Sequence, residues 1–317
     1  MRVVFLGNDP WSVAPLEALA ASSHELALVV TRDPRPAGRR GELRPTAVAD
    51  AARRLELPLL ETKTVKRDEG LEAIRDREPD ILAVVAYGEI LPLTVLELPG
   101  IAPVNVHFSL LPALRGADPV RRAILEGLDE TGVTTMRMDE GMDTGPVLLQ
   151  ASEPIRDEDD GGSLGLRLAA VGGELLVRTL DGLESGEVTG QAQDHERATM
   201  APKLTPEDEW IDWGEAATRV WNRVRALAPD TGAKTRFRDR VLKVLRAEVV
   251  EGSGQPGTVL EVSKQRLSVA AGNGAVALDE VVPEGRKRMS GVEFARGQRL
   301  EPGEVLASEP GLDNNRA

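Results

Sequence analysis

The chain up to about residue 185 alternates short apolar runs with longer amphipathic stretches. Short runs rich in Val, Ile and Leu are typical of buried strands, whereas apolar positions three or four residues apart indicate helices. The pattern predicts strands at 3–6, 25–30, 81–85, 102–108, 132–138 and 147–151, and helices at 13–21, 46–55, 119–126 and 164–183. Such alternation indicates an α/β fold with a mostly parallel, Rossmann-like sheet, and ligands bind such sheets beyond the carboxyl ends of the strands.

The remainder of the chain has a different pattern. Residues 187–208, which include "TGQAQDHERATMAPKLTPED", are polar and aperiodic and predict an extended linker. A helix at 213–226 and short strands at 235–239, 240–250, 257–262, 266–272 and 274–282 then predict a small, OB-like β-barrel. We therefore expect a first domain at 1–189, a linker at 190–208, a barrel domain at 209–305 and a disordered tail at 306–317.

Composition excludes several classes of protein and site. The chain has no cysteine, so disulfides, thiol nucleophiles and thiolate metal sites are excluded. Its three histidines, His24, His107 and His195, are too far apart in sequence for a common metal motif, and we predict no metal. No apolar run approaches the roughly 20 residues that cross a bilayer, and the first residues do not resemble a signal peptide. We expect a cytoplasmic protein with no membrane partner, and a monomer by default.

Charge is unevenly distributed along the chain. The net charge of −13 argues against broad affinity for nucleic acid. The stretch "TRDPRPAGRRGELRP" nevertheless concentrates five arginines among Pro and Gly, namely Arg32, Arg35, Arg39, Arg40 and Arg44. This composition predicts a protruding basic loop without regular structure. Such a loop is either a solvated run of charge or a contact surface for a partner.

The segment "VNVHFSLLP" contains the strongest candidates for chemistry. Asn105 and His107 are two residues apart on a predicted strand, so their side chains project from the same face. An imidazole moves protons near neutral pH, an amide stabilises negative charge on an oxygen, and a carboxylate such as Asp143 orients the imidazole. Together these groups suit acyl transfer. The alternatives are a core histidine at position 107 and an ordinary turn around Gly141, Asp143 and Gly145.

Other catalytic classes find little support. Ser109 is the nearest hydroxyl to His107, but it lacks the G-x-S-x-G turn that exposes a nucleophilic serine, which favours direct transfer between two bound substrates. The loop in "FLGNDPWS" lacks the G-x-G-x-x-G motif, so we reject a nicotinamide site.

"NVHFSLLPALRGADPV", followed by "TGVTTMRMDEGMDTGPVL", resembles the signature of formyltetrahydrofolate-dependent transferases. Three further segments resemble the methionyl-tRNA formyltransferase family in particular: "RPAGRR" its tRNA-acceptor loop, "MAPKLTPEDEWIDW" its interdomain linker, and "PEGRKRMSGVEFARGQRL" its C-terminal barrel. The resemblance extends from about residue 2 to residue 305. The departures are Asn8 and Asp9 in the first loop, Asp118 after "RGA", and the stretch "APDTGA".

The resemblance implies transfer of a formyl group from 10-formyltetrahydrofolate to the α-amino group of methionyl-initiator tRNA. It implies three groups of site residues: Asn105, His107 and Asp143 for catalysis, Ser109, Leu110, Leu111 and Pro112 for folate, and Arg39 and Arg40 for tRNA. It also implies that the barrel domain binds tRNA. The alternatives are an N-formyltransferase acting on an amino sugar nucleotide and an inactive relative that only binds folate or tRNA.

Overall fold

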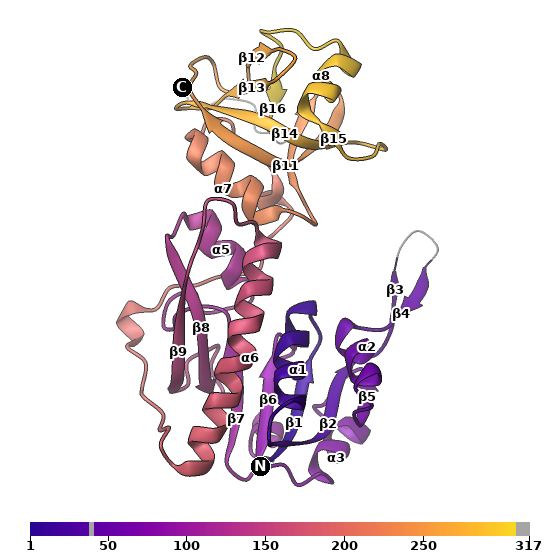
Figure 1. Cartoon of the computed structure of the whole chain (residues 1–317), viewed down its shortest axis with the longest axis vertical. Coiled ribbons are helices and arrows are strands. Elements are labelled where there is room, and N and C mark those ends of the chain that lie inside the picture. Colours follow the sequence, from indigo (N-terminus) through magenta and orange to yellow (C-terminus); the bar gives the residue numbers. More distant parts are fainter. Residues whose placement is uncertain (38–40, 309–317) are drawn as a thin grey trace. The chain divides into compact units, whose positions relative to one another are not determined.

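The computed structural model describes residues 1–37 and 41–308 (Figure 1). The chain divides into two compact units. The N-terminal unit contains Met1–Pro119, Glu130–Pro154 and Gly165–Pro202, and the C-terminal unit contains Val120–Asp129, Ile155–Leu164 and the described residues from Lys203 on. No helix in the described ranges has an apolar stretch long enough to span a bilayer.

A seven-stranded sheet forms the centre of the N-terminal unit, in the order β5-β2-β1-β6-β7-β8-β9. Its strands are β1 (Arg2–Gly7), β2 (Glu25–Arg32), β5 (Leu59–Thr62), β6 (Ile81–Val85), β7 (Ala102–His107), β8 (Glu130–Arg137) and β9 (Val147–Pro154). Neighbouring strands from β5 to β7 are parallel, whereas β8 and β9 pair antiparallel. The predicted Rossmann-like, mostly parallel sheet is confirmed.

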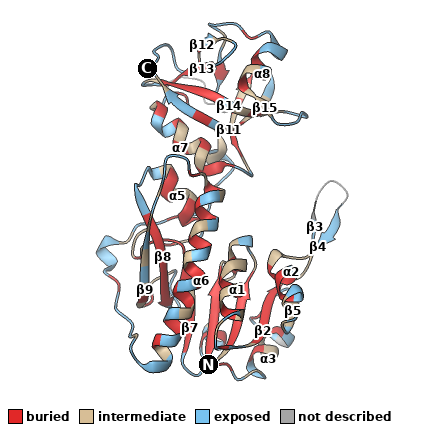
Figure 2. Cartoon of the chain, viewed as in Figure 1, coloured by how far each residue is buried: buried red, intermediate tan, exposed pale blue. Residues whose placement is uncertain are grey.

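Helices cover this sheet: α1 (Val13–Ala20), α2 (Ala47–Arg54), α3 (Asp68–Arg75), α4 (Leu93–Leu96) and the long α6 (Gly161–Ser185). The central strands are buried along their length (Figure 2), as their continuous apolar runs require. α6 approaches the sheet closely through glycine. A Cβ at Gly172 would lie 3.0 Å from Val106 Cγ1 on β7, and one at Gly165 would collide with the ring of Trp11.

A second, antiparallel sheet forms the C-terminal unit, in the order β12-β13-β14-β11-β10-β16, with β15 on β14. Its elements are α5 (Pro119–Glu126), α7 (Ala217–Leu227), β10 (Ala233–Phe237), β11 (Arg240–Val250), β12 (Val259–Val262), β13 (Leu267–Ala270), β14 (Ala275–Pro283), β15 (Met289–Ser290), α8 (Gly291–Gln298) and β16 (Leu306–Ala307). A bridge between Thr258 and Val305 joins the two edge strands and closes the sheet. The predicted small barrel is confirmed, since closure removes the edges of the sheet.

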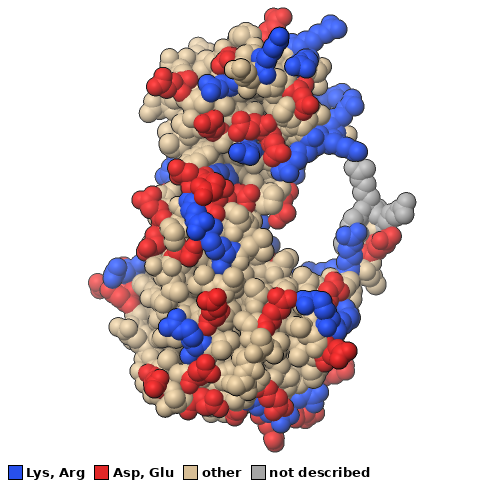
Figure 3. Space-filling view, viewed as in Figure 1, with Lys and Arg blue, Asp and Glu red and all other residues tan. Residues whose placement is uncertain are grey.

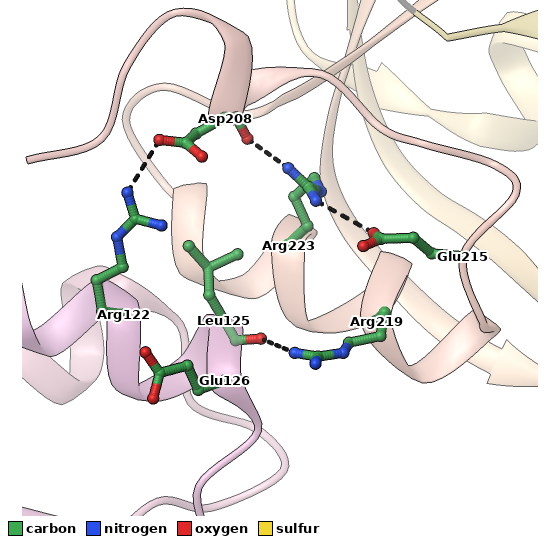
Figure 4. Close-up of a pocket in the computed structure, with 7 residues that line it drawn as sticks. All are labelled: Arg122, Leu125, Glu126, Asp208, Glu215, Arg219 and Arg223. Carbon is green, nitrogen blue, oxygen red and sulfur yellow. Dashed lines mark hydrogen bonds and ion pairs between the residues drawn. The ribbon is translucent and has the colours of Figure 1, made fainter. Parts of the chain in front are cut away.

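Within the C-terminal unit, arginines of α5 and α7 surround a small hollow (Figure 4). Arg122 Nη2 contacts Asp208 Oδ2 at 3.0 Å, and Arg219 Nη1 donates to the Leu125 carbonyl at 3.0 Å. Arg223 donates to the Asp208 carbonyl at 2.8 Å and to Glu215 Oε2 at 3.1 Å. Each guanidinium therefore has an oxygen partner inside the unit.

The structure corrects the prediction for residues 32–44. That stretch was expected to lack regular structure, but β3 (Arg35–Ala37) and β4 (Glu42–Arg44) form a hairpin in which Arg35 pairs with Arg44. Gly41 has a φ of +64°, the left-handed conformation that suits a turn between the strands. Arg39 and Arg40 lie outside the described residues, as does the predicted tail from residue 309 on.

Other boundaries also differ from the prediction. The helix expected at 213–226 begins at Ala217, because Trp213 is buried in the barrel core and its indole Nε1 donates to Thr235 Oγ1 at 3.0 Å. The expected tail began at residue 306, but Leu306 is buried and pairs with Phe237. The short elements β5 and α4 were not predicted, because four residues are too few to display a period. The helices α3 and α8 were also not predicted.

Candidate active site

β7 presents Asn105 and His107 on the face of the sheet opposite to α6. Val106 faces Gly172 of α6, and alternate residues of a strand point to opposite sides. Asn105 is half-buried and His107 is buried. The predicted shared face therefore exists, and it is the face that the long helix does not cover.

His107 is held between two oxygen acceptors. Its Nε2 lies 2.9 Å from the Leu114 carbonyl oxygen, and its Nδ1 lies 3.6 Å from Asp143 Oδ2. A neutral imidazole carries a proton on only one nitrogen, whereas the charged ring carries protons on both. Both ring nitrogens therefore face an oxygen, and these surroundings differ from those of an apolar core histidine.

Asp143 reaches His107 because the loop between β8 and β9 folds back along the sheet. β8 runs antiparallel to β7 and ends at Arg137, which pairs with Val104. A loop that continued in the direction of β8 would therefore move away from His107. A Cβ at Gly145 would collide with the carbonyl of Arg137, which makes that glycine a requirement of the turn. Asp143 Oδ2 also accepts a hydrogen bond from the Gly116 backbone N–H at 2.8 Å.

Both partners of His107 adopt the left-handed backbone conformation. Leu114 has a φ of +57° and Asp143 a φ of +54°. This conformation costs a non-glycine residue roughly 1 kcal/mol or more, and it persists only where the surroundings fix it. The strain thus falls on the two residues that hold the imidazole, which is typical of a functional site.

Arg115 and Gln193 support the loop between β8 and β9 that carries Asp143. Neither residue was predicted from the sequence to belong to the site. Gln193 Nε2 donates to the carbonyls of Asp143 at 2.9 Å and Gly145 at 2.7 Å. Its Oε1 accepts from Arg115 Nε at 3.1 Å and Nη2 at 2.7 Å, and the same Nη2 lies 3.1 Å from His195 Nδ1. Arg115 and Gln193 are both buried. Gln193 lies in the stretch that was predicted to be a linker, where nothing local distinguishes it from other polar residues.

The loop after β7 carries the four predicted folate contacts, Ser109, Leu110, Leu111 and Pro112. Ser109 is fully buried and its hydroxyl donates to the Ala113 carbonyl at 2.6 Å, while Leu111 is buried with its backbone N–H on Thr134 Oγ1 at 3.0 Å. Leu110 and Pro112 are partly exposed. The buried Ser109 and Leu111 therefore fix the loop, and the partly exposed Leu110 and Pro112 offer apolar surface beside the site.

Asn8, which departs from the family pattern in the first loop, connects three segments of this fold. Asn8 Oδ1 accepts from Thr31 Oγ1 at 3.0 Å and from the Arg32 backbone N–H at 2.8 Å, and its Nδ2 donates to the Tyr87 carbonyl. Asn8 thereby joins the ends of β1 and β2 to the loop after β6. Burial, together with the nearby Glu89 carboxylate, raises the pKa of the Tyr87 hydroxyl well above its usual value.

Asn105 differs from His107 and Asp143 because its side chain makes no hydrogen bond to any residue that the structure describes. Half-buried and beside His107, its amide is able to donate to an oxygen of a bound molecule. The cluster therefore combines an amide without a protein partner, an imidazole and a carboxylate, a set of groups that suits acyl transfer.

Comparisons with known proteins identify the family of such a cluster. Residues 1–180 match the family model of formyl transferase, and residues 203–299 match the model of its C-terminal domain. A methionyl-tRNA formyltransferase of Solibacter usitatus is 43% identical over 308 residues, which cover 96% of this chain and 98% of that protein. Another, from Citrifermentans bemidjiense, is 39% identical over 309 residues, covering 98% and 97%.

Solved structures of low sequence identity share the fold. One titled as a methionyl-tRNA formyltransferase from Clostridium thermocellum has a TM-score of 0.57 and 13% identity, and covers 92% of this chain and 100% of its own. At such identity the likeness establishes the fold and leaves the substrate to other observations.

Proposed function

The chain belongs to the formyl transferase family, and we propose that it transfers the formyl group of 10-formyltetrahydrofolate to the α-amino group of methionyl-initiator tRNA. The observation that carries this proposal is the likeness of almost the whole chain to curated methionyl-tRNA formyltransferases at 37–43% identity. The likeness includes the C-terminal unit, where residues 203–299 match the model of the family's C-terminal domain.

The reaction forms one bond and breaks one. The α-amino nitrogen of the methionyl group attacks the formyl carbon, the bond from that carbon to the folate nitrogen breaks, and a proton passes from the attacking to the leaving nitrogen. 10-Formyltetrahydrofolate supplies the formyl group, and the folate nitrogen is the leaving group. We assign to Asn105 the hydrogen bond that stabilises the formyl oxygen as negative charge develops there, since its amide lacks a protein partner.

His107 and Asp143 are assigned to the proton. The imidazole accepts the proton from the attacking amine and returns it to the leaving nitrogen, and the Asp143 carboxylate 3.6 Å from Nδ1 stabilises the charged ring in between. Buried Arg115 and Gln193 position Asp143 through its carbonyl. The partly exposed Leu110 and Pro112 fit contact with a flat ring system such as that of a folate.

Basic side chains on both units support tRNA as the acceptor. Figure 3 shows Lys and Arg side chains around the β3–β4 hairpin and over the region of β14 and β15, where Arg286, Lys287 and Arg288 follow one another. We propose that Arg39 and Arg40, in the turn of the hairpin, contact the acceptor end of the tRNA. Local positive charge of this kind allows an acidic protein to bind RNA.

A direct assay tests the proposal. Purified protein is incubated with 10-formyltetrahydrofolate and methionyl-initiator tRNA, the tRNA is deacylated, and N-formylmethionine is quantified. An amino sugar nucleotide serves as the competing acceptor, because an N-formyltransferase from Helicobacter canadensis, titled as a complex with folinic acid and dTDP-3-aminofucose, shares the fold with a TM-score of 0.64 at 15% identity. Formylation of the sugar without formylation of the tRNA would contradict the assignment.

We also propose that the protein acts in the cytoplasm, where initiator tRNA is charged and used, and that it acts as a monomer. The absence of cysteine from the chain agrees with a reducing compartment. Light scattering of the purified protein during size-exclusion chromatography checks the second point, and a mass near twice 34.1 kDa would contradict it.

A further inference from the structure

A group of polar side chains lies at the amino ends of the parallel strands of the N-terminal unit, near the end marked N in Figure 1. It consists of His24, which directly precedes β2, and of Asp181 and Glu184, in the last turn of α6. One nitrogen or oxygen atom from each of these side chains lies within 4.8 Å of the other two. His107 ends β7, which runs parallel to β2, so the group lies at the opposite end of the sheet from the candidate active site. We call it the His24 cluster.

His24 is a buried histidine with one unsatisfied ring nitrogen. The residue is 6% exposed, and its side chain is fully buried. Its Nε2 lies 3.2 Å from Asp181 Oδ1, but at an angle at which no hydrogen bond forms. The ring is held from its other side, because Nδ1 lies 3.3 Å from the Met1 nitrogen. A buried polar atom that has lost water and gained no hydrogen bond is costly, and such an atom points to a missing partner.

The position of Asp181 Oδ1 relative to Nε2 agrees with shared ligation of a metal ion. A hydrogen bond requires the acceptor to lie in line with the ring N–H, whereas in a metal site the ion lies in line and the second ligand lies to one side. Two ligands that are each about 2.0 to 2.1 Å from a tetrahedral zinc ion lie about 3.3 Å apart. The observed distance of 3.2 Å is close to that separation.

The two carboxylates stand where a helix favours a cation. Asp181 and Glu184 are three residues apart on α6, so their side chains lie on the same face of the helix. The C-terminal turn of a helix carries partial negative charge, and α6 has no basic residue in that turn. The Met1 nitrogen, 3.2 Å from Glu184 Oε1, offsets part of the negative charge. Both side chains are more than half exposed, so they can turn toward an ion and leave room for water as a further ligand.

We propose that the His24 cluster binds a divalent transition-metal ion of the class of Zn²⁺. Zinc takes imidazole nitrogens and carboxylate oxygens as ligands, whereas Mg²⁺ and Ca²⁺ prefer oxygen alone. The ion connects the end of α6 to the start of β2 and stabilises the fold. The sequence gave no sign of such a site, because His24, His107 and His195 are far apart and the carboxylates that join His24 come from a helix much later in the chain.

Binding changes the distribution of protons in the cluster. Zinc binds a neutral imidazole through the nitrogen that carries no proton, so Nε2 is free of its proton and Nδ1 carries one. Nδ1–H then donates to the Met1 nitrogen, which accepts a hydrogen bond only as the neutral amine. Zinc binding therefore releases protons, and it is best measured at about pH 8 in a chain without an added N-terminal segment.

The first measurement uses Zn²⁺ alone as the probe. Isothermal titration calorimetry gives the stoichiometry and the Kd, and thermal unfolding is followed with and without Zn²⁺, for the wild type, D181N, H24Q and the control E174Q. Glu174 is an exposed carboxyl of α6 outside the cluster. We expect the wild type and E174Q to bind one ion per chain and to gain a few degrees in Tm, because a ligand of the folded state stabilises it. D181N and H24Q should bind at least about tenfold more weakly and lose the rise in Tm.

D181N keeps the test decisive even where H24Q fails to fold, because the Asp181 side chain is exposed and its replacement leaves the core intact. The second measurement uses Co²⁺ as a coloured substitute for zinc, since its visible absorption reports the ligands and their geometry. We expect a visible band on addition of Co²⁺ to the wild type and to E174Q, and its loss in D181N.

Two results would overturn the proposal. One is a wild type that binds no Zn²⁺ or gains no stability from it, and the other is equal binding by the wild type and D181N, which would place the ion elsewhere. Both are independent of formyl transfer, so an inactive wild-type enzyme would reject the proposed function and leave the result for the His24 cluster standing.

Discussion

Each unit of the molecule has a hollow lined by three arginines, and the two hollows differ in whether these arginines have partners within the protein. In the C-terminal unit, Arg122, Arg219 and Arg223 all bind oxygens of the same unit (Figure 4). In the hollow at the foot of the β3–β4 hairpin, Arg32, Arg35 and Arg44 form no ion pair with any described residue, and Arg35 lies opposite Arg44.

The difference teaches how to separate structural from binding charges. A charged group with internal partners is held in one geometry, and its removal leaves those partners unsatisfied. A charged or polar group without internal partners adds little to folding and remains available to a ligand. The active site contains both kinds, because His107 is partnered and Asn105 is not.

The largest expected effect belongs to His107→Ala. Loss of the proton carrier should lower kcat for formyl transfer by about 10²- to 10⁴-fold. Because the Leu114 carbonyl also loses its donor, the free energy of unfolding should fall by about 1 to 3 kcal/mol. Steady-state kinetics and urea denaturation measure the two effects. A variant with wild-type kcat would support the interpretation of His107 as a core histidine.

Asn105→Ala should separate function from stability. Removal of the unpartnered amide is expected to lower kcat by about 10²- to 10³-fold, as for other oxyanion donors. The free energy of unfolding should change by less than about 0.5 kcal/mol, since no protein hydrogen bond is lost. A large loss of stability with little loss of kcat would contradict the distinction between partnered and unpartnered groups.

Gln193→Leu tests a fully partnered group. Two carbonyls lose their donor and the buried guanidinium of Arg115 loses an acceptor, so the protein should be destabilised by about 2 to 4 kcal/mol. Misplacement of Asp143 should also lower kcat with little change in the Michaelis constant for tRNA. Gln191→Leu is the matched control, because Gln191 is exposed and its backbone forms the bridge to Val147. Equal behaviour of the two variants would reject the positioning role.

Asp208 provides a pH test of the partnered hollow. Although burial alone would raise the pKa of this carboxyl, hydrogen bonds from Thr205 and the charge of Arg122 outweigh it and hold the pKa below its usual value. A lowered folded-state pKa contributes stability above the unfolded pKa of about 3.9, and this contribution is lost as pH falls through the folded value. Asp208→Asn should therefore cost about 1 kcal/mol at pH 7 and much less near pH 3.

The control for Asp208 is Glu126→Gln, a carboxyl on α5 that lines the same hollow and is exposed. Denaturant titrations at a series of pH values compare the two variants. A difference between Asp208→Asn and the wild type that stays constant from pH 7 to pH 3 would show that the charge of Asp208 is not involved.

The smallest effect is expected for Arg44→Gln. Removal of one of two facing like charges should leave the free energy of unfolding unchanged or raise it by a few tenths of a kcal/mol. Thermal unfolding in chloride buffer measures the change. A clear loss of stability would show that Arg44 has an internal partner after all, and the contrast between the two hollows would fail.

Much of the fold was predictable, because strands and helices of sufficient length display their period in the sequence. β7, with Asn105 and His107 on one face, follows from the two-residue repeat of a strand. The β3–β4 hairpin was missed because Pro34, Pro36 and Gly38 indicate irregular structure, although a short two-stranded ribbon tolerates a proline such as Pro36. Elements as short as β5 and α4 contain too few residues to show a period in the sequence.

The sequence by itself determined the α/β and barrel architecture and the position of Asn105 and His107 on one face of a strand. Through family resemblance it also determined the expected chemistry. Only the tertiary structure decided which distant groups complete the site. Gln193 contacts Asp143, 50 residues away in sequence, and Arg115, 78 residues away. The register of the β3–β4 hairpin places Arg35 opposite Arg44. Hydrogen bonds and charge pairs between separate segments depend on how the chain folds back on itself, and no local period records that.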